Sequence, residues 1–172
     1  QDSIFIERKS IRTVSNMREV ISKLNNNFSI ALFPEGTTSD GSRVLPFKSA
    51  FFSMLENKDK DIDSLDFQSF SICYTNINNL PIDRRSRPFV SWFGDMNLVS
   101  HFLQLLKLNS INVTLLFHPI FSVEGMNRKS IASLAYSQVS IGLAKVLSGR
   151  ESKVKKYMMN NNTDIKRDTS NV

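Results

Sequence analysis

Hydrophobic and polar positions along the chain follow two periods, one typical of strands and the other typical of helices. Short apolar runs or apolar–polar alternation predict strands in five segments: 3–6, 29–33, 67–74, 89–93 and 111–118. Apolar residues three or four positions apart predict helices in four segments: 15–24, 46–55, 98–108 and 127–148. Because strands and helices alternate, we expect an α/β fold whose mixed, mostly parallel sheet is flanked by helices.

Composition supports one globular domain followed by a polar tail. The chain has 172 residues, of which 41% are hydrophobic, and this is enough to bury one sizeable core. We expect the domain to cover 1–149, and 150–172 to be a basic, disordered tail. The single cysteine, Cys73, excludes an internal disulfide and suits a small core residue in a reducing compartment. Since Gln1 stands where a start Met is usual, we expect the natural start to lie upstream.

The charge balance points to anionic partners. The formal net charge is +6, which favours an anionic membrane surface or a nucleic acid. We expect no nucleic acid to bind, because the chain shows no platform of interleaved aromatic and basic residues and no recognition motif. No run of about 18 apolar residues occurs, so no membrane-spanning segment is predicted.

The segment 33–52 contains the densest candidate chemistry. Pro34 should end the preceding strand, which leaves Glu35 and Gly36 at the crevice where α/β proteins often bind ligands. Residues 37–40 (T-T-S-D) add hydroxyl groups, backbone N–H groups and one carboxylate. Spacing alone therefore leaves two readings open, a ligand-binding loop and an ordinary strand-to-helix connection.

Two motifs with matching spacing resemble the glycerolipid acyltransferase family. Residues 33–39 (F-P-E-G-T-T-S) followed by 45–48 (L-P-F-K) resemble its third sequence block, and 4–8 (I-F-I-E-R) resembles its second. Residues 91–98 (S-W-F-G-D-M-N-L) also resemble bacterial lysophosphatidate acyltransferases, whereas 67–74 lacks the proline usual in the fourth block. The resemblance implies that Arg8 holds the acceptor's phosphate and that the third block shapes the acceptor site. The substrate-binding residues that it implies are Arg8, Glu35, Gly36, Thr37, Thr38 and Lys48.

The family's catalytic pair is missing from this chain. A histidine and an aspartate spaced His-x-x-x-x-Asp act as general base and orienting acid in this family. Here the fifth residue after His101 is Leu106, and the fifth after His118 is Val123. Because the pair precedes the second block, the chain resembles the carboxyl-terminal part of the fold, incomplete at its amino terminus. We therefore expect no catalytic residue in it and no activity of this chain alone.

Both histidines are then predicted to be structural, His101 on a helix surface and His118 near a strand end. Relatives often carry Arg where this chain has Thr38, so Arg43 or Lys48 is the candidate for the lost phosphate contact. The resemblance implies no metal and no cofactor, with acyl-CoA or acyl-carrier protein as co-substrate.

The resemblance implies transfer of a fatty acyl group to 1-acylglycerol-3-phosphate, which makes phosphatidic acid in phospholipid biosynthesis. The expected partners are a lysophospholipid acceptor, the acyl donor and the cytoplasmic face of the bacterial inner membrane. Two alternatives stay open. The first is another acceptor, such as lyso-ornithine lipid, which would explain Thr38. The second is a catalytically dead fragment that only binds lipid headgroups.

Overall fold

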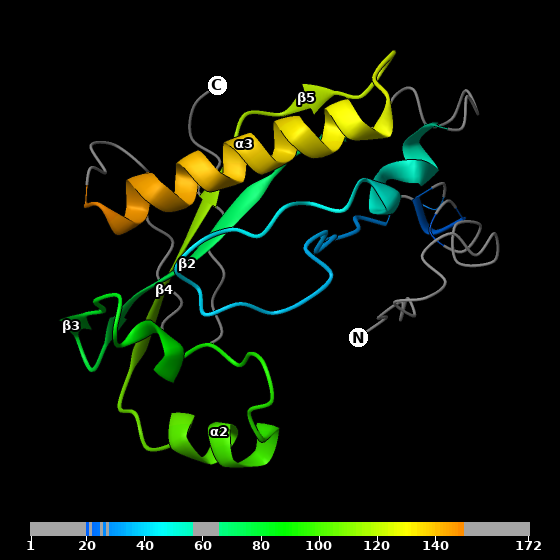
Figure 1. The fold of residues 1–172 in the computed structure, drawn as a ribbon. Helices are drawn as coiled ribbons and strands as arrows, with labels where there is room; N and C mark the ends of the chain where they lie inside the picture. Colours follow the sequence, from blue (N-terminus) through cyan, green and yellow to red (C-terminus); the bar gives the residue numbers. More distant parts are fainter. Residues whose placement is uncertain (1–19, 21, 25, 27, 57–65, 150–172) are drawn as a thin grey trace.

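The computed structural model describes residues 20, 22–24, 26, 28–56 and 66–149 (Figure 1). Short 3-10 helices (η), strands and α-helices alternate along these residues. In chain order they are η1 (Ser49–Glu56), β1 (Asp66–Phe67), β2 (Phe70–Ile77), β3 (Leu80–Pro81), η2 (Arg87–Phe89), α2 (Leu98–Leu105), β4 (Ile111–Phe117), β5 (Phe121–Ser122) and α3 (Arg128–Leu147). The α/β class is therefore correct, while the predicted Arg8 site, strand 3–6 and tail 150–172 lie outside the described residues.

All strand pairs in the described part are antiparallel, so the prediction of a mostly parallel sheet is wrong there. β2 pairs with β4 from Phe70↔Phe117 to Ile77↔Ile111, with a register shift between Tyr74 and Asn76. β3 lies on the other edge of β2, and β1 pairs separately with β5. A helix between two strands usually indicates a parallel crossover. Here α2 contacts η2 instead of covering the sheet, and the chain returns antiparallel (Figure 1).

Two predicted strands are absent from the described part. Residues 29–33 run as irregular chain, and Phe33 meets Phe70 of β2 edge-on with ring centroids 6.4 Å apart. Residues 89–93 contain the end of η2 and a turn instead of a strand. Both runs have strand composition, but composition cannot supply a neighbouring strand that offers backbone partners.

The core lies between α3, η1 and the short strands. Phe52 of η1 is fully buried against Ile131 and Ala132 of α3. The rings of Phe67 and Phe121, from the paired β1 and β5, close this cluster at 5.0 Å between centroids. Burying an aromatic side chain and its apolar neighbours is the main stabilising term at such a junction.

The position of helix α3, Arg128–Leu147, confirms the predicted helix at 127–148, and the helix packs along β2 and η1 (Figure 1). The side chain of Asn127 caps its start by accepting hydrogen bonds from the N–H groups of Lys129 and Ser130, at 3.0 and 2.9 Å. Among the described helices α3 is long and apolar enough, on average, to cross a membrane. Polar residues interrupt its apolar positions, so it contains no continuous apolar run of that length, and its contacts with β2 and η1 account for its buried face.

Candidate functional site

The two halves of the third-block motif, 33–39 and 45–48, fold against each other as one loop. The N–H of Lys48 donates to the carbonyl oxygen of Pro34 at 2.9 Å, and the N–H of Leu45 donates to Oε2 of Glu35 at 3.0 Å. A turn bond from Gly36 N–H to the Phe33 carbonyl oxygen, at 3.3 Å, sharpens the bend. The long sequence match thus reflects one physical unit.

Gly36 is required by the geometry of this loop. Its φ is +64°, in the left-handed region that favours glycine. A Cβ at this position would lie 3.0 Å from Nζ of Lys48 and 3.2 Å from Cε2 of Phe51. A side chain here would therefore strain the backbone and require the side chains of Lys48 and Phe51 to shift.

Glu35 holds the loop together from inside. Partial burial raises the pKa of its carboxyl group, while the hydrogen bond from the Leu45 N–H opposes that shift. The same side chain lines a large cavity, so the acid is both a brace for the loop and part of the cavity wall.

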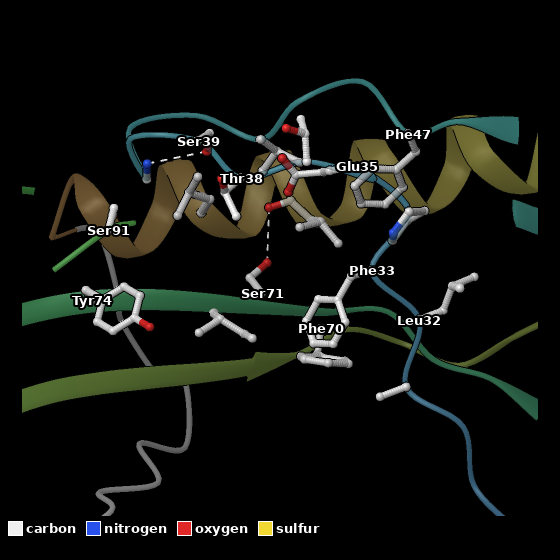
Figure 2. A pocket seen from close by; sticks show the side chains of 18 of the residues that line it. Leu32, Phe33, Glu35, Thr38, Ser39, Phe47, Phe70, Ser71, Tyr74 and Ser91 are labelled. Carbon is white, nitrogen blue, oxygen red and sulfur yellow. Dashed lines mark hydrogen bonds between the residues drawn. The ribbon is translucent and has the colours of Figure 1, made fainter. Parts of the chain in front are cut away.

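The large cavity has a volume of about 650 Å³ and lies between the third-block loop, β2, α3 and the η2–α2 region. Figure 2 shows Glu35, Thr38 and Ser39 on the loop above β2, and Phe33 turned toward Phe70. Much of the wall is apolar, and its larger members include Phe33, Phe47, Phe67, Phe70, Ile72, Val139 and Leu143. Polar side chains lie at other parts of the wall: Glu35, Thr37, Thr38, Ser39, Arg43, Arg87, Ser91 and His101. A cavity of this kind suits an amphiphile.

A second cavity, of about 470 Å³, joins two of the sequence motifs. Phe33, Gly36, Thr37 and Thr38 line it from the third block, and Trp92, Gly94 and Asp95 line it from the 91–98 motif. The 91–98 motif, distant in sequence from the third block, is therefore its neighbour in space. This contact could not be derived from either motif alone.

The structure brings most of the predicted substrate-binding residues together. Glu35, Thr37 and Thr38 line the large cavity, and Gly36 lines the second one with the two threonines. Lys48 lines neither cavity; its backbone closes the loop. Of the two candidates for a replacement phosphate contact, Arg43 lines the large cavity and Lys48 does not.

The prediction for His101 is wrong. Its side chain is 4% exposed and lines the large cavity, instead of lying on the helix surface. The apolar spacing also predicts that Leu98, Phe102, Leu105 and Leu106 form the buried face of this helix, and this is wrong, since Leu98, Phe102 and Leu106 are exposed. The helical period locates α2 correctly, but which face is buried depends on η2, and no local pattern shows that contact.

The structure reveals a contact between His118 and Ser71 that the sequence did not show. Nε2 of His118 lies 2.8 Å from Oγ of Ser71. That hydroxyl also lies 3.0 Å from the carbonyl oxygen of Val139 in α3, and a dashed line marks this bond of Ser71 in Figure 2. A carbonyl oxygen can only accept, so the single hydroxyl proton of Ser71 goes to Val139 and Nε2–H of His118 donates to Ser71. Burial, with a smaller effect of Lys145, lowers the pKa of His118. In this arrangement His118 donates to Ser71 and does not take its proton. The structural role expected for His118 stays a prediction.

In the described part of the chain, few side chains are placed for acid–base catalysis or for binding a metal ion. The ring bond recorded there for His118 goes to Ser71, not to a carboxylate. In the same residues no group of three or more His, Cys, Asp or Glu side chains is placed to hold a metal ion.

Comparison with known proteins agrees with the motifs. The family model described as Acyltransferase matches residues 2–63. Lyso-ornithine lipid O-acyltransferase of Brucella abortus is 35% identical over 155 residues, which are 88% of this chain and 58% of that protein. The enzyme of the same name from Rhizobium meliloti is 32% identical over 154 residues, covering 87% of this chain and 53% of the relative. No solved structure matches the chain.

The chain spans a little over half the length of these curated relatives. The matched stretch includes both the loop at 33–48 and the η2–α2 region that line the large cavity. With the family model covering the second and third blocks, the motifs and the relatives agree. The chain belongs to the glycerolipid acyltransferase family.

Proposed function

We propose that this chain is part of an O-acyltransferase that moves a fatty acyl group to the free hydroxyl group of lyso-ornithine lipid. Relatives with that printed name support this acceptor over 1-acylglycerol-3-phosphate. Thr38 supports it too, because an arginine that would pair with a phosphate is absent from the third block.

The large cavity is the observation that carries the proposal. Its aromatic and aliphatic wall, which includes Phe70 and Ile72 of β2, can remove a fatty chain from water. The third-block loop places Thr37 and Thr38 on the same cavity, where hydroxyl groups can hydrogen-bond the polar part of an acceptor. A single space thus offers contacts for both parts of a lysolipid.

The reaction is an acyl transfer from a thioester. The acceptor oxygen attacks the thioester carbon of acyl-CoA or acyl-carrier protein, an ester bond forms, the C–S bond breaks, and the thiol leaves with a proton. An alcohol is a poor nucleophile until a base takes its proton. In this family that base belongs to the His-x-x-x-x-Asp pair, which precedes the second block; residues 33–48 would bind and orient the acceptor.

A peripheral position on the cytoplasmic membrane face completes the proposal. The side chains of Leu98, Val99, Phe102 and Leu103 in α2 are exposed, and the side chain of the nearby Arg84 is exposed as well. Apolar side chains beside basic residues suit the surface of an anionic bilayer.

Lysophosphatidate is the second candidate acceptor. It is favoured by Arg43, which lines the cavity and can pair with a phosphate. A headgroup-binding protein without turnover is the non-enzymatic alternative.

The deciding experiment gives the intact native protein one acyl-CoA and, separately, lyso-ornithine lipid and lysophosphatidate. Mass spectrometry of the lipids then detects the acylated product. We expect acylation of lyso-ornithine lipid at a higher kcat/KM than of lysophosphatidate. The reverse preference would move the proposal to phosphatidic acid synthesis, and no transfer to either acceptor, from acyl-CoA or acyl-carrier protein, would refute the enzyme reading.

A further inference from the structure

Two buried nitrogen atoms lack a hydrogen-bond partner in the described part of the chain. They are Nε of Arg87, in η2, and Nε2 of His101, in α2. A buried polar nitrogen that has lost water without gaining a partner destabilises the fold, so native proteins rarely keep one without a reason. Two such groups on neighbouring elements therefore call for a common explanation.

Both side chains line the large cavity, together with the third-block loop. The elements that carry them, η2 and α2, contact each other. The loop also approaches this region, because a Cβ on Gly41 would lie 2.8 Å from Oγ of Ser91. Arg87 and His101 are thus part of the same space as Thr37 and Thr38, although the motifs give them no role.

The charges on this wall favour an anion. Arg87 is permanently positive, and Arg43 lines the cavity as a second cation. Of the nearby acids, Asp40 accepts a hydrogen bond from its own loop, the Ser42 N–H at 3.0 Å, and does not line the cavity. Glu35 lines the cavity but already accepts the N–H of Leu45.

We propose that Arg87 and His101 bind an anionic oxygen of the acceptor's headgroup, while the apolar wall around Phe70 holds its chain. The inference rests on the proposed lysolipid acyltransferase function and names the headgroup contacts of that site. The shared chemistry is an oxyanion that accepts N–H donors, which both a carboxylate and a phosphate supply. An ornithine headgroup would provide the carboxylate, and lysophosphatidate would provide the phosphate.

Trp92 gives a binding readout that needs no turnover. It is the only tryptophan of the 172-residue chain and lines both cavities, so a bound lipid should change its fluorescence. The measurement uses the intact native protein, in which any tryptophan other than Trp92 is replaced by Phe. Three soluble short-chain probes are titrated into it separately. They are lyso-ornithine lipid, lysophosphatidate and a monoacylglycerol of equal chain length that carries no anion.

The test compares Arg87→Gln and His101→Leu with Arg85→Gln, whose arginine is exposed on the same segment and lines neither cavity. Loss of a hydrogen bond to a charged group should raise the Kd of the anionic probes about tenfold or more in the first two variants. The Kd of the monoacylglycerol should stay within about twofold of wild type, as should all three values for Arg85→Gln. The anionic probe that wild type binds more tightly identifies the carboxylate or the phosphate as the natural group.

Melting temperature separates binding from folding. Because His101→Leu removes an unpaired buried nitrogen, this variant should melt at or above the wild-type temperature while losing anion affinity. Equal losses for the neutral and anionic probes, or no loss at all, would overturn the inference. If wild type binds anionic probes through Arg87 but transfers no acyl group, the proposed function fails and the anion site stands. If acyl transfer occurs and neither Arg87→Gln nor His101→Leu changes it, the proposed function stands and the anion site is refuted.

Discussion

Gly142 of α3 packs against β2 and β4 without room for a side chain. A Cβ built on it would lie 2.4 Å from Cε1 of His118 and 2.6 Å from Oγ of Ser71. Carbon atoms in good contact are about 3.5–4.0 Å apart, so Gly142→Ala forces either the helix or the His118 ring to move by more than 1 Å. Movement of the ring would also break the Ser71–His118 hydrogen bond of 2.8 Å.

The energetic terms of Gly142→Ala oppose one another. Alanine in a helix interior is favoured over glycine by about 1 kcal/mol. Overpacking typically costs about 1–3 kcal/mol, and the lost hydrogen bond adds about 1 kcal/mol. We therefore expect a net destabilisation of about 1–3 kcal/mol, which lowers the Tm of a chain of this size by about 2–12 °C.

Thermal unfolding followed by circular dichroism measures this change. Ser133→Ala, at an exposed position of the same helix, controls for helix propensity alone and should not lower the Tm. In a background of His118→Ala the ring is gone, so Gly142→Ala should cost less than in wild type. A Gly142→Ala variant that melts at or above wild type would show that the close approach of α3 to the sheet is not as described.

Three further changes test the loop, the core and the pH response. Gly36→Ala should destabilise by at least about 1 kcal/mol, because φ is +64° and Lys48 and Phe51 crowd the new Cβ; urea unfolding checks this, with Gly149→Ala as an uncrowded positive-φ control. Phe52→Ala should cost about 3–5 kcal/mol, since the ring is fully buried; an unchanged midpoint would contradict the described core. The raised pKa of Glu35 means that its contribution to stability is present below about pH 4.5 and is lost as pH rises through the folded pKa. Glu35→Gln keeps an acceptor for the Leu45 N–H, so its Tm relative to wild type should be higher at pH 8 than at pH 4.5, and a flat difference would count against this reasoning.

The sequence predicts best those elements whose signals are local. Helix α3 begins within one residue of its predicted start because the Asn127 cap and the apolar spacing both act within a few residues. The loop at 33–48 was found through its resemblance to the third block, and its two halves are joined locally by the hydrogen bond from Leu45 to Glu35. Strand 111–118 was predicted from alternation and is observed as β4, Ile111–Phe117.

The errors share a different cause, because each depends on a partner far away in the chain. Alternation in 67–74 shows that a strand forms, but it carries no information on whether β4 runs parallel or antiparallel to it. The run 89–93 has strand composition, yet without a neighbouring strand it forms part of η2 and a turn. His101 lies in a predicted helix, and only the contact of α2 with η2 decides that its ring is buried.

The candidate site also combines residues that a sequence motif marks with residues whose position depends on distant contacts, and this bears on how acceptor specificity arises. The residues Glu35, Thr37 and Thr38 supply one side of the large cavity, and the third-block motif marks them in the sequence. The other side comes from Arg87 and His101, in elements whose placement depends on tertiary contacts, so no motif marks them. A loop that retains its motif can therefore be combined with a different opposite wall. If Arg87 and His101 bind the headgroup, as proposed, headgroup preference can change through η2 and α2 while the loop at 33–48 stays the same.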